Sequence, residues 1–220
     1  FTALSLSTTC SQHMPPRKHS LIRHAHRRDF MPGEWGNGVS ITLNGMRAAR
    51  ACGEAFSHSD IGLIWTSPVR RCVETAHAIR EGMGGGIPIV PSHLLGDPGC
   101  LIAEREKAGE AFREMSLCDL IDRLVVGDTP PGFHPLHSGC SRLISALITS
   151  PHSSLWVTHD SIIGCIACRL FGHAESISMM PAFLESIEFF VEGGAAVAPY
   201  RGWRTKIDET AFSGVVVSRA

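Results

Sequence analysis

Two histidines and three arginines stand together in residues 21–30, LIRHAHRRDF, directly after a short apolar run. Arginine suits a phosphate ligand because its planar guanidinium binds two phosphate oxygens at once and never loses its charge. A neutral imidazole, here His24, can attack phosphorus and form a phosphohistidine. The segment therefore has the residue types for phosphoryl chemistry, with Arg23 and Arg27 as candidate phosphate ligands.

Two further apolar runs end in residues of the same kind, in the segments IWTSPVRR and LWVTHD. The first offers Arg70 in the first turn of a helix that we expect to start at Ser67, where backbone N–H groups already favour an anion. The second offers His159, which can stabilise charge on the phosphoryl oxygens in the transition state. Asp160 follows it and can protonate the leaving oxygen and then activate water.

The elements that must position these residues alternate between strand and helix patterns. Residues 19–23, 62–67 and 154–158 are short apolar runs typical of buried strands, and each is followed by residues with helical spacing. This alternation predicts an α/β fold, a three-layer sandwich with a mostly parallel central sheet and helices on both faces. We expect residues 185–194, and the segment GVVVS near the end, to close the sheet with a hairpin. Because ligands gather at the carboxyl ends of parallel strands, the three polar segments should converge.

Length and charge limit the kind of protein. The 220 residues hold 20 Lys and Arg against 21 Asp and Glu, so net charge gives no general attraction to nucleic acid or to a membrane. No apolar run approaches the roughly 20 residues needed to span a bilayer. We expect a loosely ordered leader or tag remnant over residues 1–18 and one domain over 19–220, with a short insertion of loops and helices around 91–139. The oligomeric state is not readable from the sequence.

The eight cysteines are scattered, and several lie in apolar helical patterns where a free thiol packs as a small hydrophobic group. A domain of this length needs no disulfides for stability. The one close pair, Cys165 and Cys168 in GCIACRLF, lacks a second ligand pair, so we interpret it as core packing rather than as a metal or redox site. Reduced thiols and a cytoplasmic location are the resulting predictions.

Four segments of the chain resemble one known family. In order and spacing, LIRHAHR, ITLNGMRAARACGEAF, IWTSPVRRCVETA and VTHDSIIG are similar to the Arg-His-Gly segment, the Leu-Thr-x-x-Gly helix, the Ser-Pro-x-x-Arg helix and the second histidine of the histidine phosphatase superfamily. That superfamily includes phosphoglycerate mutase-like enzymes and histidine acid phosphatases. The resemblance implies a phosphohistidine mechanism without metal or cofactor. His24 would be the nucleophile, Arg23 and Arg70 the phosphate clamps, and His159 the second histidine of the pocket.

The chain departs from the family pattern in two places. Ala25 stands where the family has glycine, and the proton donor is ambiguous. Asp160 directly after the second histidine resembles the acid phosphatases, as does Arg27, whereas the short chain resembles the mutase-like branch. We favour Asp160 as the acid, and Asp97 in the loop HLLGDPG is its rival near the substrate.

Other interpretations of the same residues stay open at this stage. Arg70 could be a solvated helix charge, and Asp160 could cap the helix that follows it. The pair His24 and His26 followed by Asp29 resembles the ligand set of binuclear metallohydrolases, but the register fails and the nearby arginines would oppose a dication.

The sequence therefore predicts a metal-independent phosphatase that hydrolyses a small-molecule phosphomonoester. Phosphoglycerate-mutase-type phosphotransfer is the alternative reaction, and a module that binds a phosphorylated ligand without turnover is the non-enzymatic alternative. The identity of the substrate cannot be inferred, because the segments that would select it match no part of the family pattern.

Overall fold

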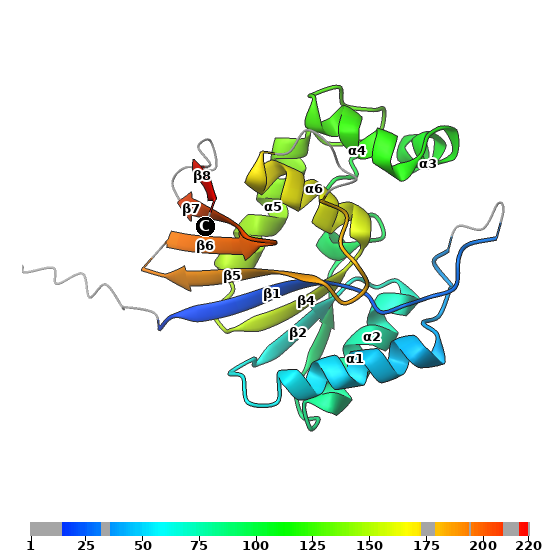
Figure 1. The fold of residues 1–220 in the computed structure, drawn as a ribbon. Coiled ribbons are helices and arrows are strands. Elements are labelled where there is room, and N and C mark those ends of the chain that lie inside the picture. The colour runs from blue at the N-terminus through cyan, green and yellow to red at the C-terminus, as the bar shows by residue number, and fades with distance from the viewer. Residues whose placement is uncertain (1–14, 32–35, 173–178, 194, 209–215, 220) are drawn as a thin grey trace, which may run out of the picture.

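The computed structural model describes residues 15–31, 36–172, 179–193, 195–208 and 216–219. Its centre is an eight-stranded sheet with the strand order β3-β2-β4-β1-β5-β6-β7-β8 (Figure 1). The strands are β1 (Arg17–Arg23), β2 (Leu63–Thr66), β3 (Ile89–Pro91), β4 (Ser154–Thr158), β5 (Ser186–Glu192), β6 (Ala195–Tyr200), β7 (Trp203–Asp208) and β8 (Val216–Arg219). Strands β1 to β4 run parallel to one another. The carboxyl ends of these four strands therefore lie along one edge.

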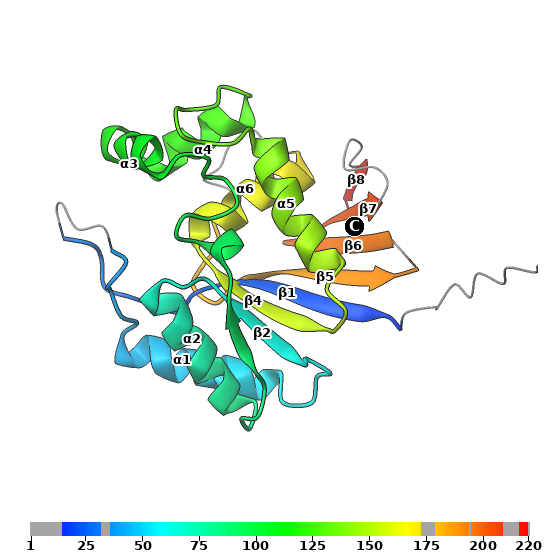
Figure 2. The ribbon, with the colours of Figure 1, turned by 180° about the vertical axis from the view of Figure 1, so that it is seen from behind.

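Helices cover both faces of the parallel half of the sheet. Their bounds are α1 (Leu43–Ala55), α2 (Arg70–Gly82), α3 (Arg105–Glu114), α4 (Leu117–Val125), α5 (Leu136–Ile148) and α6 (Asp160–Phe171), with a 3₁₀ turn η1 (His93–Leu95). Helices α1 and α2 lie on one face, and α5 and α6 lie on the other, where α3 and α4 extend outward (Figures 1 and 2). The predicted α/β sandwich with a parallel core and helices on both faces is confirmed.

The two helical layers enclose two separate apolar cores because successive strand residues point to opposite faces. Leu21 and Trp156 belong to the core under α5 and α6, whereas Ile22 and Val157 belong to the core under α1 and α2. Strand β4 is buried along its whole length. A central strand with helices on both sides needs continuous apolar sequence, which is how SLWVT reads.

The other half of the sheet is antiparallel and larger than expected. Strand β5 pairs with β1 in the antiparallel sense, and β5, β6, β7 and β8 follow one another as antiparallel neighbours. The expected single hairpin is therefore part of a four-stranded meander. The residues of β7, WRTKID, alternate between Trp, Thr or Ile and charged side chains, which is a strand pattern that our expectation did not include. The residues of β6, AAVAPY, alternate only weakly and depend on pairing with β5 and β7.

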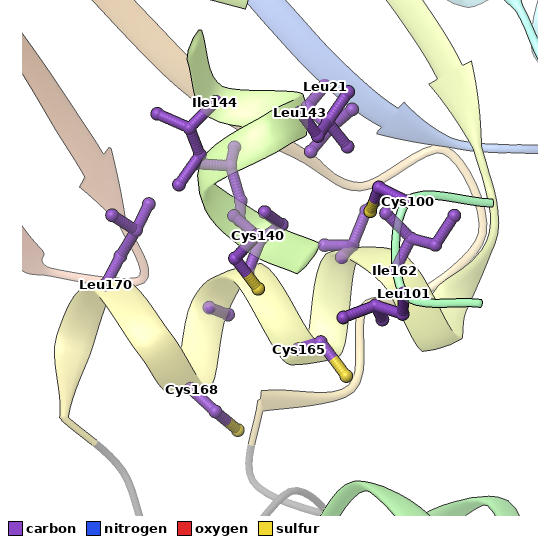
Figure 3. Packing of buried hydrophobic residues seen from close by; sticks show 14 of the residues in the cluster. Leu21, Cys100, Leu101, Cys140, Leu143, Ile144, Ile162, Cys165, Cys168 and Leu170 are labelled. Atoms are coloured by element: carbon purple, nitrogen blue, oxygen red, sulfur yellow. The ribbon is translucent and has the colours of Figure 1, made fainter. Parts of the chain in front are cut away.

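The described cysteines are free thiols, and most of them are core residues. Cys100, Cys140, Cys165 and Cys168 are nearly inaccessible to solvent and belong to one apolar core. Cys140 points from α5 toward α6, whereas Cys165 and Cys168 point from α6 to the side away from α5 (Figure 3). Burial raises the pKa of the Cys168 thiol to about 11, which keeps it protonated and unreactive. The interpretation of this pair as packing is confirmed, the cytoplasmic location stays a prediction, and Cys10 lies outside the described residues.

The structure describes only part of the expected leader over residues 1–18, and it describes the whole of the expected insertion around 91–139. Residues 1–14 of the expected leader lie outside the described residues, and Arg17 and Lys18 already belong to β1. The expected insertion around 91–139 contains η1, α3, α4 and the start of α5. None of the helices that the structure describes is both long and apolar enough to cross a membrane.

The packing of α1 on α2 depends on glycines where the two backbones meet. A Cβ atom at Gly53 of α1 would collide with the carbonyl oxygen of Ile79, and one at Gly82 would collide with the carbonyl oxygen of Arg50. Neither obstacle can swing away, because both are backbone atoms. Only glycine allows this approach of the two helices.

We predict that Gly53→Ala lowers the free energy of unfolding, measured by urea denaturation, by about 1–3 kcal/mol because the helices must separate. Intrinsic helix propensity alone would favour alanine by up to about 1 kcal/mol, so the sign of the change decides between the two effects. Gly62→Ala is the control, since a Cβ there meets its nearest neighbour at an ordinary 3.8 Å. A stabilised Gly53→Ala variant would contradict the packing.

Candidate active site

The carboxyl ends of β1, β2 and β4 bring the three polar segments together. Arg23 pairs with Thr158 in the parallel register, and the N–H of His24 donates to the Thr158 carbonyl at 2.9 Å. From the other side of β4, the N–H of Ser67 donates to the carbonyl of Val157 at 2.9 Å. The residues that follow each strand therefore start from adjacent positions, as the sequence predicted (Figure 1).

His24 is almost completely buried, and its own backbone sets its tautomer. Nδ1 lies 2.8 Å from the Ala25 carbonyl oxygen, which can only accept, so Nδ1 carries the proton. Nε2 then has a free lone pair and accepts from Nε of Arg71 at 3.1 Å. Burial, more than the nearby arginines, lowers the pKa of His24 to about 3. The imidazole is therefore neutral at pH 7, with Nε2 as its nucleophilic atom.

His159 faces His24 across the pocket, with ring centroids 5.6 Å apart. Its Nδ1 accepts from a terminal nitrogen of Arg71 at 2.9 Å, which leaves the proton on Nε2, 3.0 Å from Ser67 Oγ. Burial and then the charge of Arg71 hold the pKa of His159 well below its usual value. Cys72 packs against the same ring, with its Sγ 3.6 Å from Nε2.

Arg71, and not Arg70, is the arginine that α2 contributes. The guanidinium of Arg71 joins both histidines and also donates to the Gly36 carbonyl at 2.8 Å. Arg70 lies outside this group, with a side chain 61% exposed and an ion pair to Glu74 at 2.8 Å. The expectation that Arg70 lies in the pocket is wrong.

The physical reason is the pitch of the helix. One residue turns a side chain by about 100° around the axis, and the buried residues Cys72, Thr75 and Ala76 show which side of α2 faces the sheet. The helix also begins at Arg70 rather than at Ser67, whose hydroxyl lies against His159 and accepts from the N–H of Val69. Counting four residues from Ser67 in Ser-Pro-x-x-Arg leads to Arg71, so the motif contained the signal.

Arg23 links β1 to two neighbouring elements. One terminal nitrogen donates to Asp160 at 2.6 Å, and the other donates to the Pro181 carbonyl at 2.7 Å. Its backbone pairs with the same loop, through the Glu185 carbonyl and the N–H of Leu184. The Nε of Arg23 is buried and has no hydrogen-bond partner. A buried donor without a partner is costly unless a ligand satisfies it.

Arg27 belongs to the same cationic cluster. Burial lowers its pKa, and Asp160 and Arg23 both act on its charge, which places it near the pocket. Its guanidinium lies 3.6 Å from the ring centroid of Phe30, and its Nε is a second buried donor without a partner. The structure therefore brings Arg23, Arg27 and Arg71 together.

The two candidate acids lie in different surroundings. Asp160 is the first residue of α6, with one oxygen on Arg23 and the other accepting from the N–H of Ser161 at 2.9 Å. The Asp97 carboxylate forms an ion pair with Arg105 at 2.9 Å. Asp160 acts on the charges of His24, Arg27 and Arg71. The geometry therefore favours Asp160.

Several residues of the site were not found from the sequence. Gly96 lies so close to the pocket that a Cβ there would clash with Ser67 Oγ and with His159 Nε2. Phe183 has its ring centroid 5.7 Å from that of His24 and lies 4.0 Å from the guanidinium carbon of Arg23. A glycine and a phenylalanine in loops carry no pattern, so only the fold identifies them. Cys72 and Thr75, whose hydroxyl accepts from the N–H of Ala25 at 3.0 Å, read as core residues of α2.

A metal site is not formed by this cluster. Among the residues that the structure describes, no three His, Cys, Asp or Glu side chains come together in a way that could hold an ion. Asp29 of the alternative metallohydrolase motif is exposed. Independence of the reaction from metals stays a prediction.

The chain matches a known protein family over most of its length. The profile described as histidine phosphatase superfamily (branch 1) matches residues 20–186, which is most of the chain. The chain belongs to this superfamily. The resemblance stated from four short motifs is therefore confirmed, and the matched range contains His24, Arg71, His159 and Asp160.

Solved structures of this superfamily share the fold. A phosphoserine phosphatase mutant from Entamoeba histolytica superposes with a TM-score of 0.61 at 15% identity, over 84% of this chain and 95% of the other. A putative alpha-ribazole-5'-P phosphatase from Escherichia coli gives 0.59 at 16% identity, over 83% and 95%. A mycobacterial glucosyl-3-phosphoglycerate phosphatase gives 0.54 at 17% identity, over 80% and 91%. Likenesses at such identity establish the histidine phosphatase fold, and curated proteins yield no match.

We predict that Arg71→Gln weakens the binding of inorganic phosphate, measured by calorimetry, by tenfold or more, since a charge-assisted hydrogen bond contributes about 1.5–3 kcal/mol. Arg70→Gln is the matched control one residue away, and its exposed ion pair should change affinity by no more than about twofold. Equal losses in the two variants would contradict the assignment of Arg71.

Proposed function

We propose that the protein hydrolyses small-molecule phosphomonoesters through a phosphohistidine on His24, without a metal ion. The observation that carries this proposal is the environment of His24, a neutral imidazole whose Nδ1 is held by the Ala25 carbonyl and whose Nε2 lone pair points toward Arg71. Nucleophilic attack by histidine requires an unprotonated nitrogen at a fixed position.

The charge of the pocket supports a phosphate ligand. Arg23, Arg27 and Arg71 carry three positive charges, while both histidines are neutral. With Asp160 in the acid form that the first step requires, these three charges attract a phosphomonoester dianion. The buried Nε donors of Arg23 and Arg27 lack partners, and phosphoryl oxygens would satisfy them.

In the first step, Nε2 of His24 attacks phosphorus, the N–P bond forms, and the bond from phosphorus to the ester oxygen breaks. Asp160 in its acid form gives a proton to the departing alkoxide. The guanidinium of Arg71, which His159 holds through its Nδ1, donates hydrogen bonds to the equatorial oxygens, where negative charge is concentrated.

In the second step, water attacks the phosphorus of the phosphohistidine and Asp160 takes a proton from it. The N–P bond breaks, inorganic phosphate is released, and His24 returns to its neutral form with the proton still on Nδ1. Arg71 donates to both imidazoles in the free site, so phosphate binding must replace its contact with Nε2 of His24 before that nitrogen can attack.

We predict that the protein releases inorganic phosphate from 4-nitrophenyl phosphate in excess EDTA, and that His24→Ala lowers this rate by a factor on the order of a thousand or more, because the nucleophile is lost. Phosphate release is followed colorimetrically. Acid-labile, base-stable labelling of the intact protein by a ³²P-labelled ester would detect the phosphohistidine.

Three results would contradict the proposal in different ways. Loss of activity in EDTA, with recovery on adding a divalent ion, would indicate metal catalysis. Consumption of ester without release of phosphate would indicate phosphotransfer to a second alcohol. Tight binding of the ester without turnover would indicate a non-catalytic module.

The assignment of the acid is tested by pairing two substrates with two variants. Asp160→Asn should lower kcat/KM for an alkyl phosphate by about 10²–10⁴-fold, because kcat/KM reports the formation of the phosphohistidine, in which the departing alkoxide needs a proton. The same variant should affect 4-nitrophenyl phosphate far less, since nitrophenolate leaves unprotonated. Asp97→Asn should lower both rates little and equally.

The comparison of substrates separates proton donation from positioning. Asp160 also holds Arg23, and the loss of that contact would slow both esters to the same degree. A selective loss for the alkyl ester in Asp97→Asn instead would assign the acid to Asp97.

A further inference from the structure

We propose that Phe183 and Phe30 bind the alcohol part of the substrate, and that the protein selects phosphomonoesters of uncharged aromatic or apolar alcohols. This inference rests on the proposed function, because it concerns the part of the ester that lies outside the phosphate pocket. It goes beyond that function by naming a substrate class and the residues that select it.

The first observation is the position of Phe183. Its ring lies 4.0 Å from the guanidinium carbon of Arg23, and its centroid is 5.7 Å from that of His24 and 5.0 Å from that of His26. Arg23 also holds Asp160, the group that faces the leaving oxygen. The alcohol must leave from near that carboxyl group, so Phe183 lies beside its path.

The second observation is a matching aromatic group on Arg27 and Arg71. The ring of Phe30 lies 3.6 Å from the guanidinium carbon of Arg27 and 5.5 Å from that of Arg71. Gly36 makes room for it, since a Cβ at that position would overlap the ring. Phe30 is nevertheless 40% exposed. A large apolar side chain fixed against two phosphate ligands while still open to solvent is suited to contact a ligand.

The third observation is the balance of the charges around the cluster. Near the pocket, Arg70 pairs with Glu74, Asp97 pairs with Arg105, and Glu185 pairs with Arg201. The proposed function assigns the three charges of Arg23, Arg27 and Arg71 to the phosphate group. A substrate with an additional carboxylate would bring a further anion to surroundings in which Arg70, Arg105 and Arg201 already have carboxylate partners.

The rim therefore offers two phenylalanine rings and the exposed His26 to the rest of the substrate. Aromatic rings stack on these groups, and burying apolar area against them is favourable. A carboxylate next to the same rings would lose water without gaining a partner. Both effects favour an uncharged aromatic alcohol over an anionic one.

The test compares kcat/KM for benzyl phosphate, ethyl phosphate and phosphoglycolate. Benzyl alcohol and ethanol are leaving groups of similar basicity, so the comparison reports binding of the ring and not chemical reactivity. We expect kcat/KM for benzyl phosphate to be about tenfold higher than that for ethyl phosphate, in keeping with the energies of aromatic contacts. We expect kcat/KM for phosphoglycolate to be lower than that for ethyl phosphate.

The variants Phe183→Leu and Phe30→Leu should each reduce the ratio of benzyl to ethyl phosphate by about threefold, because leucine keeps apolar volume and removes the ring face. Phe190→Leu is the matched control. Phe190 is 46% exposed and lies over Lys18 at the amino end of β1, away from the pocket. It should leave the ratio unchanged. A structural role of either ring would slow both esters alike and would not move the ratio.

The outcomes separate this inference from the function on which it rests. If no ester is hydrolysed in a His24-dependent manner, the proposed function fails and the inference fails with it. If hydrolysis depends on His24 but does not favour benzyl phosphate, or if its preference survives both leucine variants, the inference alone is overturned.

Discussion

The hydrogen bonds from Arg71 to two imidazoles constrain the whole site. A guanidinium only donates, so each histidine nitrogen that it contacts must accept. This fixes the proton of His24 on Nδ1 and that of His159 on Nε2, and it requires both rings to be neutral. Burial also keeps both rings neutral, because removal from water disfavours the charged form of each imidazole and lowers its pKa. The proposed reactive group then consists of a neutral nucleophile, His24, a permanent cation, Arg71, and a single carboxylate, Asp160.

The fold serves this arrangement by placing three strand ends in register. Backbone hydrogen bonds join His24 and Ser67 to β4, so the sheet fixes the backbone from which these pocket side chains extend. Two further contacts hold the pocket in place. The backbone at Gly96 lies close against His159, and the N–H of Ala25 donates a hydrogen bond to the hydroxyl of Thr75. Small residues at these points let the backbone itself form part of the pocket wall.

The sequence was sufficient for features that depend on a repeating pattern. Apolar runs identified β1, β2 and β4, and the rule that ligands meet the carboxyl ends of parallel strands correctly joined His24, His159 and Asp160. The sequence was insufficient where a shift of one residue changes the direction of a side chain. It predicted Arg70 in the pocket, where the structure has Arg71. A step of about 100° on a helix is smaller than the uncertainty in where that helix begins. Phe183 and Phe30 could not be found, because loop residues are placed by contacts between distant parts of the chain.

The double attachment of Arg23 has a consequence for how this protein could change its preferences. Arg23 holds Pro181 through its side chain and Leu184 and Glu185 through its backbone, so the loop that carries Phe183 is tied to the residue before the nucleophile. Remodelling that loop would disturb a phosphate ligand together with the alcohol contact. Among the described residues, Phe30 contacts this cluster through its ring alone, which lies on Arg27 and Arg71. Selection for a new alcohol would therefore meet less resistance on the Phe30 side, which makes the two walls of the pocket unequal in their evolutionary freedom.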